Sequence, residues 1–310
     1  MIFSDILQAI GHTPLVELKN LTPNPKVRIL AKLEGQNPSG SVKDRIALAM
    51  VEAAERNGDL RPGLTILEPS SGNTGIALAL VGRIKGYPVK IVMPDNVSIE
   101  RRQLLALYGA EVVLSDGRRG SNGSIELAAE LARDPSYFMP YQYGNPMNIQ
   151  AHYLTTGVEI VEDAPDLDAF VAGLGTGGTL MGVGRRLKEH NPRVRVVAVE
   201  PEQGDLVQGL RSLADGFIPP ILDLDLLDGK IVCGSGDALE GQRQLALREG
   251  IFAGISSGAV VYGALRLARN LERGTIVALF ADGVWKYLST GLWTKDAAAF
   301  EKDMADKLWW

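Results

Sequence analysis

The chain has 310 residues, of which 22% are charged and 45% hydrophobic, and its net charge at pH 7 is -5. This composition is typical of a globular protein, and without a basic tract it argues against binding to nucleic acid. No apolar run approaches about 18 residues, and the N-terminus lacks the basic start and apolar core of a signal peptide, so we expect a cytoplasmic protein without a membrane span.

Short β-branched runs alternate with longer helical patterns along the chain. The runs typical of strands are, in chain order, 27–34, 64–70, 89–94, 110–116, 168–174, 194–201 and 275–282. Helical patterns occur at 41–58, 76–86, 98–109, 123–133, 150–163, 175–191 (a turn and then a helix) and 251–270. Strands that are apolar on both faces, alternating with helices, predict an α/β fold with parallel sheets covered by helices. Residues 202–228 instead read as one long loop.

The stretch "SGSVKDRIALAM" reads as the start of an amphipathic helix with a lysine on its apolar side. Ser41 is a suitable N-cap, Asp44 three residues later resembles a capping box, and Gly58 is suited to end the helix. Residues three and four apart share a helix face, and the face of Lys43 carries Ile46, Ala47, Met50, Val51 and Ala54.

A charged ammonium on Lys43 is disfavoured twice. Burial opposes the charge, and so does the positive end of the helix dipole. Lysines desolvated in this way form Schiff bases. The simpler alternative is a side chain that reaches water and pairs with Asp44 or Glu34.

Two turns between a strand and a helix are suited to anions. In "PSSGNTG" (69–75), hydroxyl and amide side chains surround a glycine at a helix start: Ser70, Ser71, Gly72, Asn73 and Thr74. Such a turn can bind a carboxylate or a phosphate, or it can simply cap the helix.

The second turn, "GLGTGGT" (173–179), fits the dinucleotide pattern G-x-G-x-x-G, and Glu200 ends the next strand. An NAD-dependent dehydrogenase is therefore an alternative. A phosphate monoester would use the same glycines, and the hydroxyls of Thr176 and Thr179 favour it.

One desolvated lysine and two anion sites together suggest pyridoxal phosphate (PLP) with an amino-acid substrate. PLP also needs a partner for its pyridine nitrogen. Ser256 in "GISSGA" lies at a predicted helix start, where its hydroxyl can serve the ring nitrogen or cap the helix.

Cysteine and histidine give no further site. Cys233 is the single cysteine, which excludes an intrachain disulfide, and its place at a strand end predicts a buried thiol. The three histidines (His12, His152 and His190) lie far apart in the sequence, so we expect no metal centre.

Seven motifs together resemble the cysteine synthase family of fold type II PLP enzymes: "GHTPLVEL", "KLEGQNPSGSVKDR", "EPSSGNTG", "QYGNP", "GLGTGGTLMG", "EGIFAGISSGA" and "KYLSTG". The resemblance covers nearly the whole chain. "GIFAGIS", "WKYLSTG" and the terminal "KLWW" resemble the cysteine synthase B branch most, especially its actinobacterial O-phosphoserine sulfhydrylases.

The resemblance implies a two-domain, tryptophan synthase β-like fold and a homodimer. The smaller, mobile domain would span 37–146 and carry the substrate carboxylate loop. The larger domain would span 1–36 and 147–310, with the PLP phosphate loop, a lid at 202–228 and a C-terminal tail that covers the site or packs elsewhere.

The resemblance also implies a role for each site residue. Lys43 would be the Schiff-base lysine, Asn73 would bind the 3′ oxygen of the cofactor, and Ser256 would bind the pyridine nitrogen. The PLP phosphate would be bound by Gly175, Thr176, Gly177, Gly178 and Thr179. The substrate would be bound by Ser70, Ser71, Gly72, Thr74, Gln142 and Arg211. Ser70 and Gly177 depart from the threonine common in relatives.

The implied reaction is a β-replacement that makes L-cysteine. Lys43 would remove the α-proton of an activated serine, elimination would give α-aminoacrylate, and a sulfur nucleophile would add. The nucleophile would be sulfide or a thiocarboxylated sulfur-carrier protein. Because a guanidinium binds a phosphate dianion better than a neutral ester, Arg211 favours O-phosphoserine over O-acetylserine. The alternatives are an O-acetylserine sulfhydrylase, a cystathionine β-synthase-like enzyme, the NAD enzyme, and a binding protein without catalysis.

Overall fold

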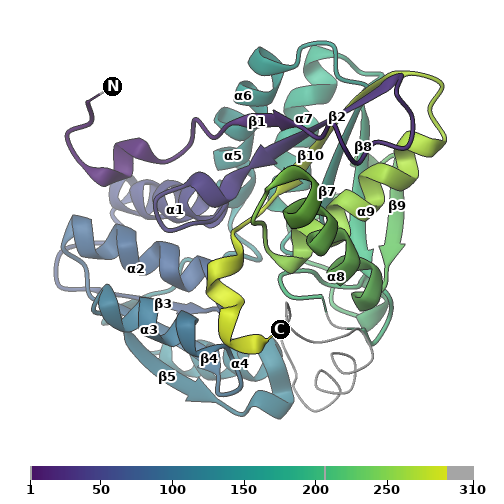
Figure 1. Ribbon diagram of the computed structural model, residues 1–310. Coiled ribbons are helices and arrows are strands. Elements are labelled where there is room, and N and C mark those ends of the chain that lie inside the picture. Colours follow the sequence, from purple (N-terminus) through teal and green to yellow (C-terminus); the bar gives the residue numbers. More distant parts are fainter. Residues whose placement is uncertain (1, 206, 292–310) are drawn as a thin grey trace.

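The computed structural model describes residues 2–205 and 207–291, and Figure 1 shows their arrangement. The predicted role of the terminal tryptophan pair, 309–310, concerns residues outside this described part. No helix in the described ranges is long and apolar enough to cross a membrane.

Two sheets organise the described chain. The larger has the strand order β1 (Leu15–Glu17), β2 (Val27–Leu33), β10 (Gly274–Phe280), β7 (Ala169–Gly173), β8 (Arg195–Pro201) and β9 (Gly229–Cys233). Its strands pair in parallel, except that β1 runs antiparallel to β2. The smaller sheet is parallel throughout, in the order β5 (Glu111–Ser115), β4 (Val89–Pro94), β3 (Thr65–Pro69) and β6 (Tyr137–Phe138). This arrangement confirms the predicted α/β fold.

Helices cover the sheets. The α-helices are α1 (Lys43–Asn57), α2 (Asn73–Lys85), α3 (Ile99–Leu107), α4 (Gly120–Leu131), α5 (Pro146–Leu154), α6 (Thr156–Asp163), α7 (Gly178–His190), α8 (Ser235–Gln244) and α9 (Ile255–Arg269). Short 3₁₀ turns occupy Ile6–Ala9, Glu34–Gln36, Gly117–Arg119, Leu213–Asp215, Leu224–Leu226 and Val284–Thr290, and a π-helical turn occupies Leu245–Glu249. The last 3₁₀ turn, η7, lies between the two sheets in Figure 1.

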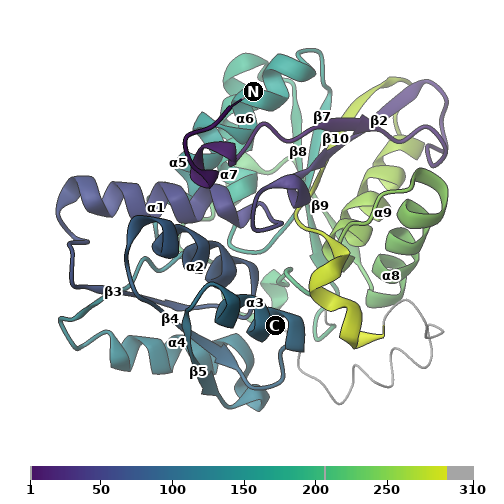
Figure 2. The same cartoon turned by 60° about the vertical axis from the view of Figure 1, so that its left-hand side comes forward.

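Both faces of the larger sheet are buried. Successive side chains of a strand point to opposite faces. On β7, Val171 packs in the core with Val260 of α9, whereas Phe170 packs in the core with Val183 of α7. Figure 2 shows α8 and α9 on one side of this sheet and α5, α6 and α7 on the other. This double burial explains why the strands read as continuous apolar runs.

The predicted helix over 150–163 is wrong in one respect, because it is two helices that part at Thr155. The backbone there leaves the helical region, with φ -121° and ψ -76°. The Thr155 hydroxyl donates to the carbonyl of Ala151 at 2.7 Å, which the Thr155 N–H also contacts at 3.1 Å. A side chain that competes for helix carbonyls in this way favours a break.

The predicted helix caps differ in detail. Asp44 does not reach back to Ser41, since its carboxylate accepts the N–H and the hydroxyl of Ser39. Ser98, where the third helical pattern begins, directly precedes α3, but its hydroxyl donates to the carbonyl of Lys286 at 2.9 Å instead of capping the helix. Gly58 ends α1 in the left-handed conformation, with φ 77°, as predicted.

The site lies where the two sheets face each other. Parallel strands bring their carboxyl ends to one edge, and ligands of open α/β sheets bind there. The turns after β3, β6, β7 and β10 all reach one cavity. The division into domains at 37–146 stays a prediction, although every strand of the smaller sheet lies within 65–138.

Candidate active site

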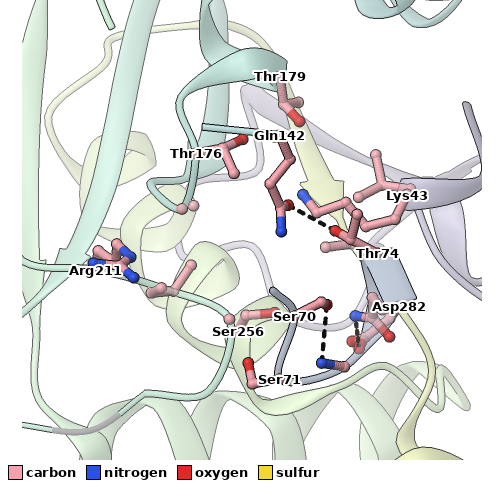
Figure 3. A pocket seen from close by; sticks show the side chains of 18 of the residues that line it. Lys43, Ser70, Ser71, Thr74, Gln142, Thr176, Thr179, Arg211, Ser256 and Asp282 are labelled. Carbon is pink, nitrogen blue, oxygen red and sulfur yellow. Dashed lines mark hydrogen bonds between the residues drawn. The ribbon is translucent and has the colours of Figure 1, made fainter. Parts of the chain in front are cut away.

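One cavity gathers nearly all the residues proposed from the sequence (Figure 3). Its lining includes Lys43, Ser70, Ser71, Gly72, Asn73, Thr74, Gln142, Gly175, Thr176, Gly177, Thr179, Arg211 and Ser256. Gly178 does not line it but forms the first residue of α7 beside it. Residues from six separate stretches of chain therefore meet at a single place.

Lys43 enters the cavity from the first turn of α1. The loop before it is fixed to the end of β10, because the Val42 N–H donates to the carbonyl of Ala281 at 2.8 Å. Burial lowers the pKa of Lys43 to about 8, and the nearby charge of Asp282 offsets part of this effect. In the described part of the chain, no hydrogen bond or ion pair to the Lys43 amine is found. A desolvated amine without a carboxylate partner is suited to act as a nucleophile.

The alternative in which Lys43 pairs with a neighbouring carboxylate is wrong. Asp44 bonds to Ser39, and Glu34 accepts from Arg45 at 2.7 Å. Both carboxylates are buried and already occupied.

The turn before α2 stabilises the start of its helix and also lines the cavity. The hydroxyl oxygen of Ser70 accepts from the N–H groups of Gly72 and Gly75, at 3.3 and 3.0 Å, and so stabilises the helix start. The other residues of the turn still line the cavity. Thr74 donates its hydroxyl to Oε1 of Gln142 at 2.7 Å, which ties this turn to the loop after β6.

The loop that carries Gln142 is held by a buried carboxylate. Oε1 and Oε2 of Glu68 accept the backbone N–H groups of Gln142 and Tyr141, at 3.0 and 2.8 Å. Burial raises the pKa of Glu68 to about 7, and these two hydrogen bonds partly lower it again. Tyr141 has φ 54°, an uncommon value for a tyrosine, and Glu68 stabilises this conformation. No local sequence pattern predicts this role for Glu68.

The glycine turn after β7 forms a cradle at the N-terminus of α7. Gly177 has φ 87°, a left-handed conformation that favours glycine. A Cβ on Gly175 would lie 2.9 Å from the carbonyl oxygen of Gly209. The free N–H groups of a helix start and two threonine hydroxyls are suited to a phosphate.

Two further side chains hold this cradle and were not predicted. Asn148 donates to Thr176 Oγ1 at 3.0 Å and to the carbonyl of Gln142 at 2.9 Å, so it joins the phosphate turn to the substrate loop. His152 lies between the hydroxyls of Thr179 and Thr156, at 3.2 and 2.9 Å. Burial, with the charges of Lys43 and Arg45, lowers the pKa of His152 far below its usual value, so the ring is neutral.

Ser256 does not cap α9. The helix begins at Ile255 after Gly254, with no side-chain hydrogen bond at its cap. Ser256 is buried, and it lines the cavity opposite the phosphate turn. Its hydroxyl is therefore available to a ligand.

Arg211 lies across the cavity from Lys43 (Figure 3). Its guanidinium lies against the rings of Tyr143 and Phe217, 4.9 and 4.8 Å from their centroids, and the two rings contact each other edge to face. Its Nη2 donates to the Tyr143 hydroxyl at 3.3 Å, and its backbone N–H donates to the carbonyl of Leu174 at 2.7 Å. No carboxylate pairs with it among the described residues. Two aromatic faces thus hold a cation that keeps its donors for an anionic ligand.

The segment after β10 supplies site residues that the sequence reasoning missed. Asp282 lines the cavity and accepts from Asn73 Nδ2 at 2.7 Å. The Tyr287 hydroxyl also donates to Asp282, and the Arg101 guanidinium lies 4.8 Å from the Tyr287 ring centroid. Oδ1 of Asp282 is buried without a partner in the described structure. The motif "KYLSTG" pointed to this segment but gave its residues no role.

These side chains fit PLP. The cavity offers an amine for the aldehyde, a glycine cradle at a helix N-terminus for the phosphate, and a hydroxyl for the ring nitrogen. The dinucleotide alternative fits poorly, because Glu200 accepts from Lys230 Nζ at 2.7 Å and from the Leu213 N–H at 3.0 Å. Its carboxylate is thus used within the fold.

The remaining sequence candidates carry no site. Cys233 is buried and free, and burial raises the pKa of its thiol to about 12. Across 2–205 and 207–291, no group of three or more His, Cys, Asp or Glu side chains could hold a metal ion.

Comparisons with known proteins agree with this geometry. A family model described as "Pyridoxal-phosphate dependent enzyme" matches residues 6–282. The cysteine synthase of Staphylococcus aureus strain Mu50 is 47% identical over 302 residues, covering 94% of this chain and 97% of that protein.

Solved structures give the same result. The cysteine synthase (OASS) of Entamoeba histolytica matches with a TM-score of 0.89 and 38% identity, over 99% of this chain and 96% of its own. An O-ureido-L-serine synthase matches with a TM-score of 0.90 and 41% identity, over 97% of this chain and 100% of its own. The chain therefore belongs to the family of pyridoxal-phosphate-dependent enzymes, as a member of the cysteine synthase type.

Proposed function

We propose that this enzyme makes L-cysteine by β-replacement on O-phosphoserine. The observation that carries the choice of substrate is Arg211, a cavity cation without a carboxylate partner in the described structure. The cavity then offers three places for anions: the turn before α2, the turn before α7 and this guanidinium. They correspond to the substrate carboxylate, the cofactor phosphate and the phosphate leaving group.

The bound cofactor supplies an electron sink for the carbanion that forms at the α-carbon. Lys43 anchors the cofactor and, once released by the substrate, accepts the α-proton, for which a pKa near 8 is suited. The turn at 70–74 and Gln142 orient the substrate carboxylate. Asn73 and Ser256 bind the ring of the cofactor.

Arg211 distinguishes the two activated serines by charge. A phosphate ester carries two negative charges that a guanidinium can bind through two parallel hydrogen bonds, whereas an acetyl ester is neutral. The flanking rings of Tyr143 and Phe217 restrict the guanidinium to one region of the cavity, which lowers the entropy cost of binding.

The substitution Arg211→Ala tests this assignment. We expect kcat/KM for O-phosphoserine to fall by roughly 10- to 100-fold, the range for a charge-assisted hydrogen bond, while the value for O-acetylserine changes by less than about threefold. The matched control is Arg118→Ala, which removes an exposed arginine paired with Asp116 and should leave both values unchanged. Equal losses for the two substrates would show that the assignment is wrong.

Other members of the family motivate a wider substrate panel. One structural relative is named O-ureido-L-serine synthase, so a shared fold does not fix the product. Product analysis with serine, O-acetylserine and O-phosphoserine separates a phosphoserine enzyme from an O-acetylserine or cystathionine β-synthase-like enzyme. A protein without catalysis would bind PLP, with an absorbance band near ~410 nm, but the band would not change when substrate is added.

The sulfur donor is sulfide or a thiocarboxylated sulfur-carrier protein, which share a nucleophilic sulfur. Single-turnover rates with each donor, measured after the first half-reaction is complete, decide between them. If the carrier protein is the donor, the single-turnover rate should saturate at micromolar carrier concentration. If sulfide is the donor, adding the carrier should not change this rate. The lid at 202–228 and the homodimer stay predictions.

A further inference from the structure

A second lysine is buried beside the site but does not line the cavity. Lys286 lies in η7 and its side chain is fully buried. Its Nζ donates to Oδ1 of Asn73 at 2.8 Å and to the carbonyl of Gly40 at 3.0 Å. Neither the proposed reaction nor the fold otherwise accounts for a buried cation here.

The partners of Asn73 dictate which way its amide lies. A protonated lysine amine can only donate to an amide, and an ionised carboxylate can only accept from one. Lys286 therefore requires the amide oxygen on its own side, and Asp282, 2.7 Å from Nδ2, requires the NH₂ group on the other. Asp282 lines the cavity and Lys286 does not, so the NH₂ group lies on the cavity side.

Lys286 is itself held by the chain around it. Its carbonyl accepts the hydroxyl of Ser98 at 2.9 Å, and the next residue, Tyr287, donates to Asp282. Burial lowers the pKa of Lys286 to about 8, with Asp282 and then Asp44 raising it in part. Its two bonds do not depend on this titration, because a neutral amine still has two N–H groups to donate.

We propose that Lys286 is a positioning residue that fixes the Asn73 amide with its NH₂ group toward the cofactor. The inference rests on the proposed role of Asn73 as the donor to the 3′ oxygen of PLP. Without Lys286 the amide can turn over and present its oxygen, which would repel the 3′ oxygen. Lys286 thus acts through Asn73 and does not touch the substrate.

The experiment compares Lys286→Met with Lys286→Arg, each in the native chain and in an Asn73→Ala background. The readouts are the Kd for PLP, the absorption maximum of the holoenzyme and the urea midpoint, none of which needs turnover. In the native chain we expect Lys286→Met to weaken PLP binding about five- to tenfold, which is the free energy of one hydrogen bond. We also expect the absorption maximum to shift. Lys286→Arg keeps a donor and should stay within about twofold.

The background supplies the decisive comparison. If Lys286 acts through Asn73, Lys286→Met adds less than about twofold once Asn73 is alanine, because coupled residues are not additive. An equal loss in both backgrounds, or a normal Kd and spectrum for Lys286→Met, would overturn the inference.

Two controls separate the possible failures. If Lys286→Met does not fold, Lys286→Gln replaces it. A glutamine can present either end of its amide to Asn73, so its loss of PLP affinity should lie between those of Lys286→Arg and Lys286→Met. A loss of PLP affinity no larger than that of Lys286→Arg would overturn the inference. A normal Kd for Asn73→Ala would overturn the inference by removing the role of Asn73. The substrate proposal fails separately, in the Arg211→Ala comparison.

Discussion

Two residues apart on α1, Lys43 and Arg45 lie in opposite electrostatic surroundings. Arg45 contacts Glu34 at 2.7 Å and Glu159 at 2.6 Å, and Glu159 also pairs with Lys32 at 2.7 Å. These contacts form one network of two cations and two anions: Lys32, Arg45, Glu34 and Glu159. On the neighbouring face of the helix, the Lys43 amine has no such partner within the described chain.

This difference separates buried charge that holds the fold from buried charge that does chemistry. Although burial raises the pKa of Glu159, Arg45 and then Lys32 lower it to about 2, so Glu159 stays ionised over the usual pH range. Lys43 instead has its pKa lowered to about 8. A desolvated amine that forms no ion pair is the one that a ligand can use.

The largest expected effect is the loss of catalysis in Lys43→Ala. Removing the group that anchors the cofactor and moves the α-proton should lower cysteine formation by at least about 10³-fold. In enzyme without PLP the urea midpoint should not fall, since Lys43 has no ion pair to lose and its desolvated charge opposes folding. The control Lys188→Ala removes a lysine paired with Asp228, and its cysteine formation should be normal. A Lys43→Ala variant that keeps more than a tenth of the cysteine-forming activity would show that Lys43 does not carry the chemistry.

The next effect concerns the network and appears in stability. Glu159→Gln leaves Lys32 and Arg45 with one anion between them, and breaking a buried pair costs about 3–5 kcal/mol. Urea unfolding followed by fluorescence measures it. The control is Glu126→Gln at an exposed pair with Arg119, which should cost less than about 1 kcal/mol. Similar costs for the two variants would show that the network is not structural.

The smallest effect is the pH dependence of Lys43 in the enzyme stripped of PLP. Only the neutral amine attacks an aldehyde, so the rate of PLP rebinding should rise about tenfold per pH unit and level off near pH 8. The folded pKa lies below the unfolded one, so the unfolded chain binds more protons between the two values. Stability should therefore rise with pH from about 8 to 10.5. A rebinding rate that still rises tenfold per unit above pH 9 would contradict the depressed pKa.

Local sequence patterns predicted much of the fold and part of the site. Lys43 was recognisable because a helical period placed it on an apolar face, and the glycine turns were recognisable from strand, turn and helix in sequence. These signals lie within about ten residues. Resemblance to a family added Gln142 and Arg211, for which local patterns gave no role.

Contacts between distant segments could not be predicted. Asn73 and Asp282 are 209 residues apart and meet only because β10 ends beside the start of α2. The burial of Lys286 could not be predicted for the same reason, since "VWKYLST" has no hydrophobic periodicity that would place its lysine on an apolar face. The Asp44 cap failed for a local reason, because the turn before α1 places the N–H and hydroxyl of Ser39, five residues before Asp44, against its carboxylate.

The central claim is that the amine of Lys43 holds the cofactor, and borohydride reduction of the holoenzyme tests it most directly. Reduction fixes the bond between PLP and its lysine, and peptide mass spectrometry then locates the pyridoxyl group. We predict the adduct on Lys43, with Lys32 and Lys286 unmodified. An adduct on another lysine, or none at all in enzyme that still shows the band near ~410 nm, would contradict the account.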